Sequence, residues 1–309
     1  MRRKWRKIGR AWRGEIPWRP FWLLFALSFL LTFSLRYFSE GAMRSQAKLH
    51  LLQGLFAWRQ DPKVLLSFQL GFLEGGRRQP LAVMEDEIRK PLPASDQPLV
   101  AVFHTHTGES YVPSRGKDRT VGKEGDIVQV GAALAEGLQT HGIGVIHVRK
   151  VHDGDPWHLS YTRSRVTVRQ LQAEYPSLKI FIDVHRDGIA DPKTPRDVTT
   201  TTLGAQKVAR IMLYVGSERG GKPFPNRSKV LSFNQKLQKT MEQLYPGLAR
   251  PMFTRGGFPH NQDLADDFLL VEIGDARLNS KQEAVKAAGL LADSLALLLY
   301  QEGKNEKAP

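Results

Sequence analysis

The sequence predicts an α/β domain over residues 98–303, with a mostly parallel sheet and helices on both faces. Two observations predict it. Short apolar runs rich in β-branched residues alternate along the chain with longer segments of helical spacing. The runs are also apolar enough for strands that are covered on both sides. Strands alternating with helices are typical of parallel sheets with helical crossovers.

The predicted elements follow one another in a regular order. Strands are predicted at 99–103, 143–148, 179–184, 208–216 and 267–274, and helices at 127–142, about 160–174, 228–247 and 280–301. Gly142 ends the first helix, and Pro246-Gly247 ends the third. Residues 304–309 form a frayed tail.

The first 38 residues predict a membrane anchor. The chain has a net charge of +14, and residues 1–20 hold eight Lys and Arg against one acidic residue. An uncharged apolar run follows at 21–35 and is extended by Phe38, at the short end of the roughly 17–25 residues that span a bilayer. The positive-inside rule keeps 1–20 in the cytoplasm. We therefore expect a single-pass protein of the cell membrane, anchored by 21–38, with its catalytic domain extracytoplasmic. A signal peptide cleaved before Ala42 is the alternative.

Residues 39–97 predict a juxtamembrane region. Two stretches in it have the spacing of amphipathic helices, and Pro91, Pro93 and Pro98 mark a linker before the domain.

Composition excludes several kinds of site. The chain has no cysteine, so it has no disulfide and no thiolate metal site. Any metal must be held by His, Asp or Glu. A nucleic-acid partner is not expected, because the basic cluster precedes a membrane span and no DNA- or RNA-binding motif is present.

Three predicted strand ends carry residues that bind metals or transfer protons. Open α/β sheets build their sites beyond the carboxyl ends of strands, so these residues are expected to meet there. They are His104, His106 and Glu109 after the first strand, His185 and Arg186 after the third, and Glu272 near the end of the last.

A hydrolytic zinc site needs about three protein ligands and one open position. His104 or His106, together with Glu109 and His185, would supply the ligands, and Glu272 would be the acid/base group. A glutamate within an apolar strand is unusual unless it has a partner or a role. The alternatives are a loop of hydrogen-bonded turn residues at 104–109 and a structural ion pair at His185-Arg186-Asp187.

At these residues the chain resembles the stage II sporulation protein P family of sporulation cell-wall amidases. The similar stretches are VAVFHTHTGESYVPS, VQVGAALAEGLQTHGIGVIHVRKVHD, SYTRSR, IFIDVHRDGI and NQDLADDFLLVEIGD, in that order over about residues 98–300. The resemblance implies the phosphorylase/hydrolase-like fold of zinc N-acetylmuramoyl-L-alanine amidases. It implies Zn²⁺ as cofactor and peptidoglycan as substrate, with cleavage of the muramoyl-L-alanine amide during engulfment and possible cleavage of stem-peptide cross-links. It also implies two partners, stage II sporulation protein D, a lytic transglycosylase, and stage II sporulation protein M, a membrane scaffold.

The resemblance transfers unevenly to single residues. His185 and Glu272 match the family motifs directly. His106 is favoured over His104, and Glu109 over Glu124, as the remaining ligands. Arg186 would bind a substrate carboxylate or polarise the scissile carbonyl, or else brace its loop through Asp187. The family-like NQDL motif places Asn261 in the cleft, while Arg163 and Arg165 anchor a helix.

Two rival functions remain open at this stage. One is a membrane-tethered wall-binding or scaffold protein without turnover, and the other is a different metal hydrolase such as a deacetylase or phosphoesterase.

Overall fold

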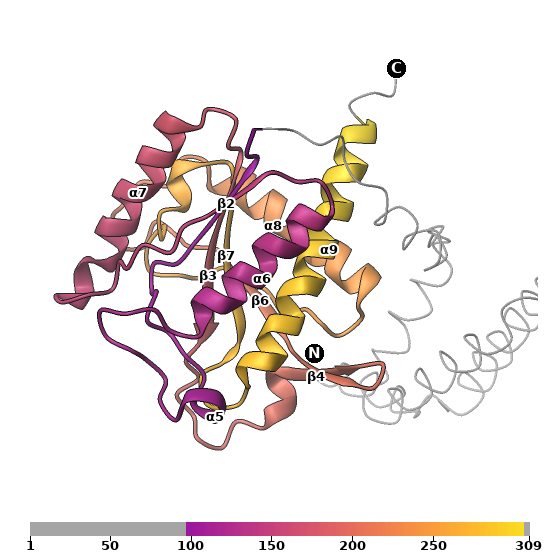
Figure 1. Cartoon of the computed structure of the whole chain (residues 1–309). Coiled ribbons are helices and arrows are strands. Elements are labelled where there is room, and N and C mark those ends of the chain that lie inside the picture. The colour runs from indigo at the N-terminus through magenta and orange to yellow at the C-terminus, as the bar shows by residue number, and fades with distance from the viewer. Residues whose placement is uncertain (1–96, 306–309) are drawn as a thin grey trace, which may run out of the picture. The chain divides into compact units, whose positions relative to one another are not determined.

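A five-stranded sheet lies at the centre of residues 97–305, the part of the chain that the computed structural model describes (Figure 1). Its order is β2-β1-β3-β7-β6, and every neighbouring pair is parallel except β6 with β7. The predicted α/β domain with a mostly parallel sheet is therefore confirmed. The strands are β1 (Val100–Phe103), β2 (Val145–His147), β3 (Ile180–Asp187), β6 (Ile211–Tyr214) and β7 (Asp267–Asp275).

Helices cover both faces of this sheet, as predicted. α6 (Ile127–Thr140) and α9 (Lys281–Asn305) pack on one face, and α7 (Ser160–Glu174) lies on the other (Figure 1). The alternation of strand side chains divides the core accordingly, because Val100 and Val102 face α6 while Ala101 and Phe103 face the α7 side. α8 (Arg227–Leu244) packs against α9 and β7. The short helical elements are α5 (Val112–Arg115), η1 (Trp157–Leu159), η2 (Arg196–Val198) and η3 (Gln262–Leu264).

The single strand predicted at 208–216 is wrong, because two strands share that apolar run. β5 (Gln206–Ala209) pairs with β4 (Thr200–Leu203) in a separate antiparallel hairpin, while β6 belongs to the main sheet. The break is at Arg210, whose N–H donates to Thr199 O at 2.7 Å and whose carbonyl accepts from Gly274 N at 2.9 Å. Arg210 thus bonds through its N–H to the residue before β4 and through its carbonyl to β7. Apolar periodicity does not reveal such a change of strand partner.

Several predicted segments lie outside the described residues. These are the basic segment 1–20, the anchor 21–38, and the juxtamembrane region 39–97 apart from Gln97. Within 97–305 no helix is long and apolar enough to cross a membrane. Of the predicted tail 304–309, the first two residues continue α9 and the last four are not described.

Gly131 in α6 lies directly against the buried ring of His104. A Cβ at Gly131 would lie 2.4 Å from His104 Cε1 and 2.5 Å from its Nε2, and both ring nitrogens of His104 have polar partners. We expect Gly131→Ala to lower the free energy of unfolding by about 1–3 kcal/mol, because overpacking outweighs the gain in helix propensity. Gly289→Ala in α9 meets no atom within 4 Å and should raise it by about 0.5–1 kcal/mol. Urea unfolding measures both, and stabilisation of both would contradict the close contact.

Candidate active site

The predicted site residues gather where β1, β3 and β7 end, on the face of the sheet that α7 covers. β3 lies between β1 and β7, so the loop after β1 runs beside the end of β3. In the β3–β7 register His185 lies opposite Glu272, so their side chains share one face. Five of the six predicted residues meet at this edge. They are His106, Glu109, His185, Arg186 and Glu272.

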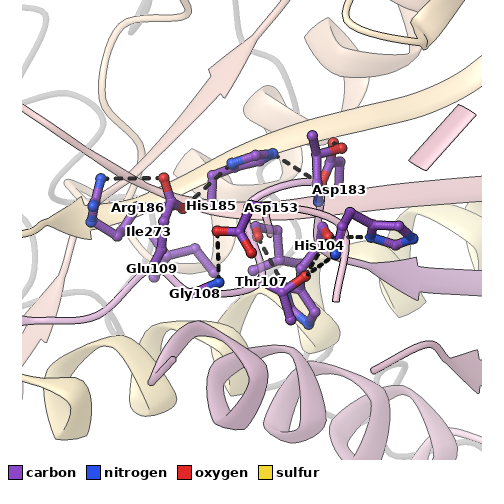
Figure 2. A network of polar contacts seen from close by, with 12 residues as sticks. His104, Thr107, Gly108, Glu109, Asp153, Asp183, His185, Arg186 and Ile273 are labelled. Carbon is purple, nitrogen blue, oxygen red and sulfur yellow. Dashed lines mark hydrogen bonds and ion pairs between the residues drawn. The ribbon is translucent and has the colours of Figure 1, made fainter. Parts of the chain in front are cut away.

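Four charged side chains form one row across this edge (Figure 2). Arg186 Nη1 lies 3.2 Å from Glu109 Oε1, and Glu109 Oε2 lies 3.4 Å from His185 Nδ1. His185 Nε2 lies 2.9 Å from Asp183 Oδ1, a charge contact without hydrogen-bond geometry. All four side chains are buried. A buried imidazole is thus held between two carboxylates.

The charges in this row depend on each other. Burial opposes ionisation of Glu109, but Arg186 and His185 outweigh it and lower the pKa of Glu109 to about 2. Burial also opposes a charge on His185, yet Asp183 and Glu109 raise its pKa well above the ordinary value. The carboxylates of Glu109 and Asp183 therefore stabilise a positive charge at the position of the His185 imidazole.

His106 lies on the α7 side, next to this row. Its ring stacks on Trp157 at a centroid distance of 4.9 Å and meets the ring of His185 edge-on at 5.3 Å. Tyr161 of α7 packs against it from another side. Burial lowers the pKa of His106 to about 4, so its imidazole is neutral at physiological pH. Its Nδ1 is buried and has no hydrogen-bond partner among residues 97–305.

Glu272 has a buried carboxylate oxygen without a partner. Its Oε2 accepts no hydrogen bond, and burial raises the pKa of the carboxyl to about 8 despite the nearby charge of His185. A carboxyl group in such surroundings can hold and release a proton near neutral pH. The role of Glu272 as the acid/base group stays a prediction.

The guanidinium of Arg186 donates hydrogen bonds to three other residues of the protein. Besides Glu109, it donates to Ser110 O at 3.3 Å and to Asp118 O at 3.0 Å. It therefore braces the loop after β1, and it does so without Asp187, which pairs instead with Arg250 at 2.8 Å. The contact of Arg186 with substrate stays a prediction.

His104 lies on the opposite side of the sheet from His106. It is fully buried under α6, with Nδ1 3.0 Å from Val184 O and Nε2 3.0 Å from His147 Nε2. Burial and His147 together lower the pKa of His104 to about 3. The histidine beside Glu109 and His185 is therefore His106. Glu124 lies apart as well, half-exposed in an ion pair with Arg149 at 2.6 Å.

A family model described as stage II sporulation protein P matches residues 78–296. The chain belongs to the stage II sporulation protein P family. Stage II sporulation protein P from Bacillus subtilis is 30% identical over 223 residues, which cover 68% of this chain and 53% of that protein. The chain thus spans about half the length of the curated relative it matches. The resemblance inferred from the motifs is confirmed.

Solved structures of amidases are similar at low identity. An N-acetylmuramoyl-L-alanine amidase from Clostridium difficile has a TM-score of 0.42 and 16% identity, covering 70% of this chain and 100% of that one. An N-acetylmuramyl-L-alanine amidase from Mycobacterium smegmatis has a TM-score of 0.41 and 14% identity, covering 67% and 99%. Similarity at this level does not decide the activity of this stage II sporulation protein P family member.

The structure adds residues that the sequence reasoning missed. Asp183 is fully buried and accepts from both Thr105 N at 2.8 Å and Thr105 Oγ1 at 2.6 Å, which fixes the start of the loop after β1. In the sequence, Asp183 is indicated by its position as a carboxylate inside an apolar strand. It lies two residues before His185 and therefore on the same face of the strand. Trp157 and Tyr161 gave no such signal, because nothing in their spacing links them to His106.

Other predicted residues have structural contacts. Asn261 donates to Tyr161 O and Ser164 Oγ, each at 3.0 Å, and so holds α7 in place. Arg165 pairs with Asp263, and Arg163 donates to carbonyls of the 152–156 loop, which agrees with the anchoring role predicted for both. Among residues 97–305, no group of three His, Cys, Asp or Glu side chains stands ready to hold a metal ion.

Proposed function

We propose that this chain is a zinc-dependent peptidoglycan hydrolase that cleaves the amide between N-acetylmuramic acid and L-alanine. One observation carries the proposal. Within residues 97–305, the buried atoms His106 Nδ1 and Glu272 Oε2 have no hydrogen-bond partner, and they lie at one strand edge beside the His185 imidazole and a carboxylate kept ionised. Unsatisfied buried polar groups are costly, so two at one place indicate a missing ligand and a chemical role.

The separations support zinc as that ligand. Ligand atoms on a tetrahedral zinc ion lie about 3.4 Å apart when each bond is about 2.1 Å, and Glu109 Oε2 and His185 Nδ1 are 3.4 Å apart. Two imidazoles on one such ion have ring centroids about 5 Å apart, and those of His106 and His185 are 5.3 Å apart. The donors His106, Glu109 and His185 therefore have separations close to those that zinc requires. Within residues 97–305 they are not yet arranged as a group that could hold a metal ion.

Asp183 would support the same metal site from the other ring nitrogen of His185. Histidines that bind a metal commonly present their other ring nitrogen to a carboxylate, which orients the ring and strengthens the ligand. His185 faces Glu109 with Nδ1 and Asp183 with Nε2. Asp183 would thus aim Nδ1 of His185 at the metal.

Bound zinc would supply a Lewis acid that polarises the scissile carbonyl and makes water more acidic. The protein would supply the proton transfer. Glu272, with a buried and unpartnered Oε2, would take a proton from the attacking water and return it to the leaving nitrogen. Arg186 would hold Glu109 and the loop after β1 in place through its three protein contacts.

The proposed setting follows from the family and from the N-terminal sequence. We propose a single-pass protein anchored by residues 21–38, with the hydrolase domain outside the cell membrane, acting during sporulation engulfment. Stage II sporulation proteins D and M are its proposed partners, and cleavage of stem-peptide cross-links is a proposed second activity.

Digestion of purified peptidoglycan tests the proposal. The purified protein with zinc should release free stem peptides with a new L-alanine amino terminus, and chelation should stop the release. Mass spectrometry of the products distinguishes the rivals, because released acetate would indicate a deacetylase and unchanged wall would indicate a binding or scaffold protein.

A further inference from the structure

Arg119 is a cation beside the site that pairs with no acidic group in the described part of the chain. Its guanidinium carbon lies 4.9 Å from the centroid of the Trp157 ring. The guanidinium of Arg186, by contrast, donates to Glu109, Ser110 and Asp118. Arg119 therefore has guanidinium donors to offer to another molecule.

The backbone at Arg119 is held firmly. Ser110 N donates to Asp118 O at 2.8 Å, and Thr120 N donates to Gly108 O at 2.7 Å, so residues on both sides of Arg119 are bonded to the loop after β1. Glu109 and Arg119 face each other in an antiparallel bridge. Arg119 thus begins next to a proposed zinc ligand, and its side chain extends over the Trp157 ring.

Trp157 connects this cation to the reacting centre. Its ring stacks on His106 at 4.9 Å with an interplanar angle of 11°. Arg119, Trp157 and His106 therefore form a short stack that starts at the rim of the site and ends at a proposed ligand. Trp157 is 45% exposed, so this stack is accessible to solvent and to substrate at its Trp157 ring.

We propose that Arg119, supported by Trp157, binds a carboxylate of the substrate beside the scissile amide. The proposal rests on the proposed function and specifies its substrate as an acidic peptide. Stem peptides of peptidoglycan carry free carboxylates close to the muramoyl amide, and a guanidinium fork matches a carboxylate in geometry and charge. Stacking on an aromatic ring orients a cation. Burial raises the pKa of the Asp153 carboxyl, and the charge of Arg119 partly opposes this rise without an ion pair between the two side chains.

A pair of substrates isolates this contact. One is a muramoyl-peptide fragment with free stem carboxylates, and the other is the same fragment with those carboxylates converted to primary amides. The full chain should prefer the acidic fragment in kcat/KM by about tenfold to a hundredfold, the usual range for one charge-assisted hydrogen bond. Arg119→Gln should lose most of this preference by slowing only the acidic fragment, while Arg119→Lys should retain part of it.

Lys117→Gln is the matched control, because it removes one charge from the same loop and should keep the parent preference. Equal slowing of both fragments by Arg119→Gln, or an unchanged preference, would overturn the proposal. Titration calorimetry with the two fragments measures the preference as binding. It therefore decides the role of Arg119 even when the parent cleaves neither fragment, a result that would count against the proposed hydrolase activity alone.

Discussion

Glu272→Gln is expected to reduce hydrolysis of peptidoglycan by about 10²- to 10⁴-fold while zinc binding stays at the parent level. The amide has nearly the shape of the carboxyl group but cannot take a proton from water and return it. Glu272 is not among the three proposed ligands, so the metal should remain. Product release measured by mass spectrometry, together with zinc content, checks both parts.

The free energy of unfolding of Glu272→Gln should not fall along with its activity. The Glu272 carboxyl is buried without a partner for Oε2, and this environment raises its pKa to about 8. A neutral amide removes the cost of burying the ionised form, so the free energy of unfolding at pH 8 or above should not fall. A loss of both stability and activity would indicate a packing role instead.

Glu124→Gln is the matched control for this prediction. It also replaces a carboxyl by an amide, but at a half-exposed position whose partner is Arg149. Its digestion rate and zinc content should equal those of the parent. Parent-like digestion by Glu272→Gln would remove that residue from the acid/base role.

His106→Ala is expected to lower zinc affinity by more than about a hundredfold, whereas His104→Ala should leave it unchanged. Loss of a residue that only supports a ligand costs 10- to 100-fold, so loss of a ligand should cost more. His104 faces α6 and His147 on the far side of the sheet, so it contributes no donor to this site.

The His104 variant should instead be unstable. Removing a fully buried ring leaves a cavity and an unpaired His147, which should lower the free energy of unfolding by about 2–4 kcal/mol. Zinc is therefore measured per folded molecule, by competition with a chelator at a temperature where both variants are native. Loss of zinc from His104→Ala with zinc retained by His106→Ala would reverse the assignment.

Most elements of the domain could be predicted because each is encoded locally. The helix over 127–142 is α6 at 127–140, the helix over 160–174 is α7 at the same residues, and the strand over 267–274 is β7 at 267–275. In these segments apolar spacing, together with the end signal Gly142 after α6, agrees with the tertiary environment. The segment at 208–216 was wrong because β5 and β6 are both apolar, and only their hydrogen-bond partners distinguish them.

By itself the sequence determined the α/β class, the family, and which strand ends carry histidines and carboxylates, since all of these depend on local pattern and residue type. Only the tertiary structure decided which histidine after β1 joins the site. His104 still follows the strand alternation and faces α6. Thr105, bound to Asp183, lies in the turn after β1, and His106 turns to the α7 side. That choice, like the pairing of Glu109 with His185 across 76 residues of sequence, depends on contacts between distant segments, which spacing along the chain does not encode.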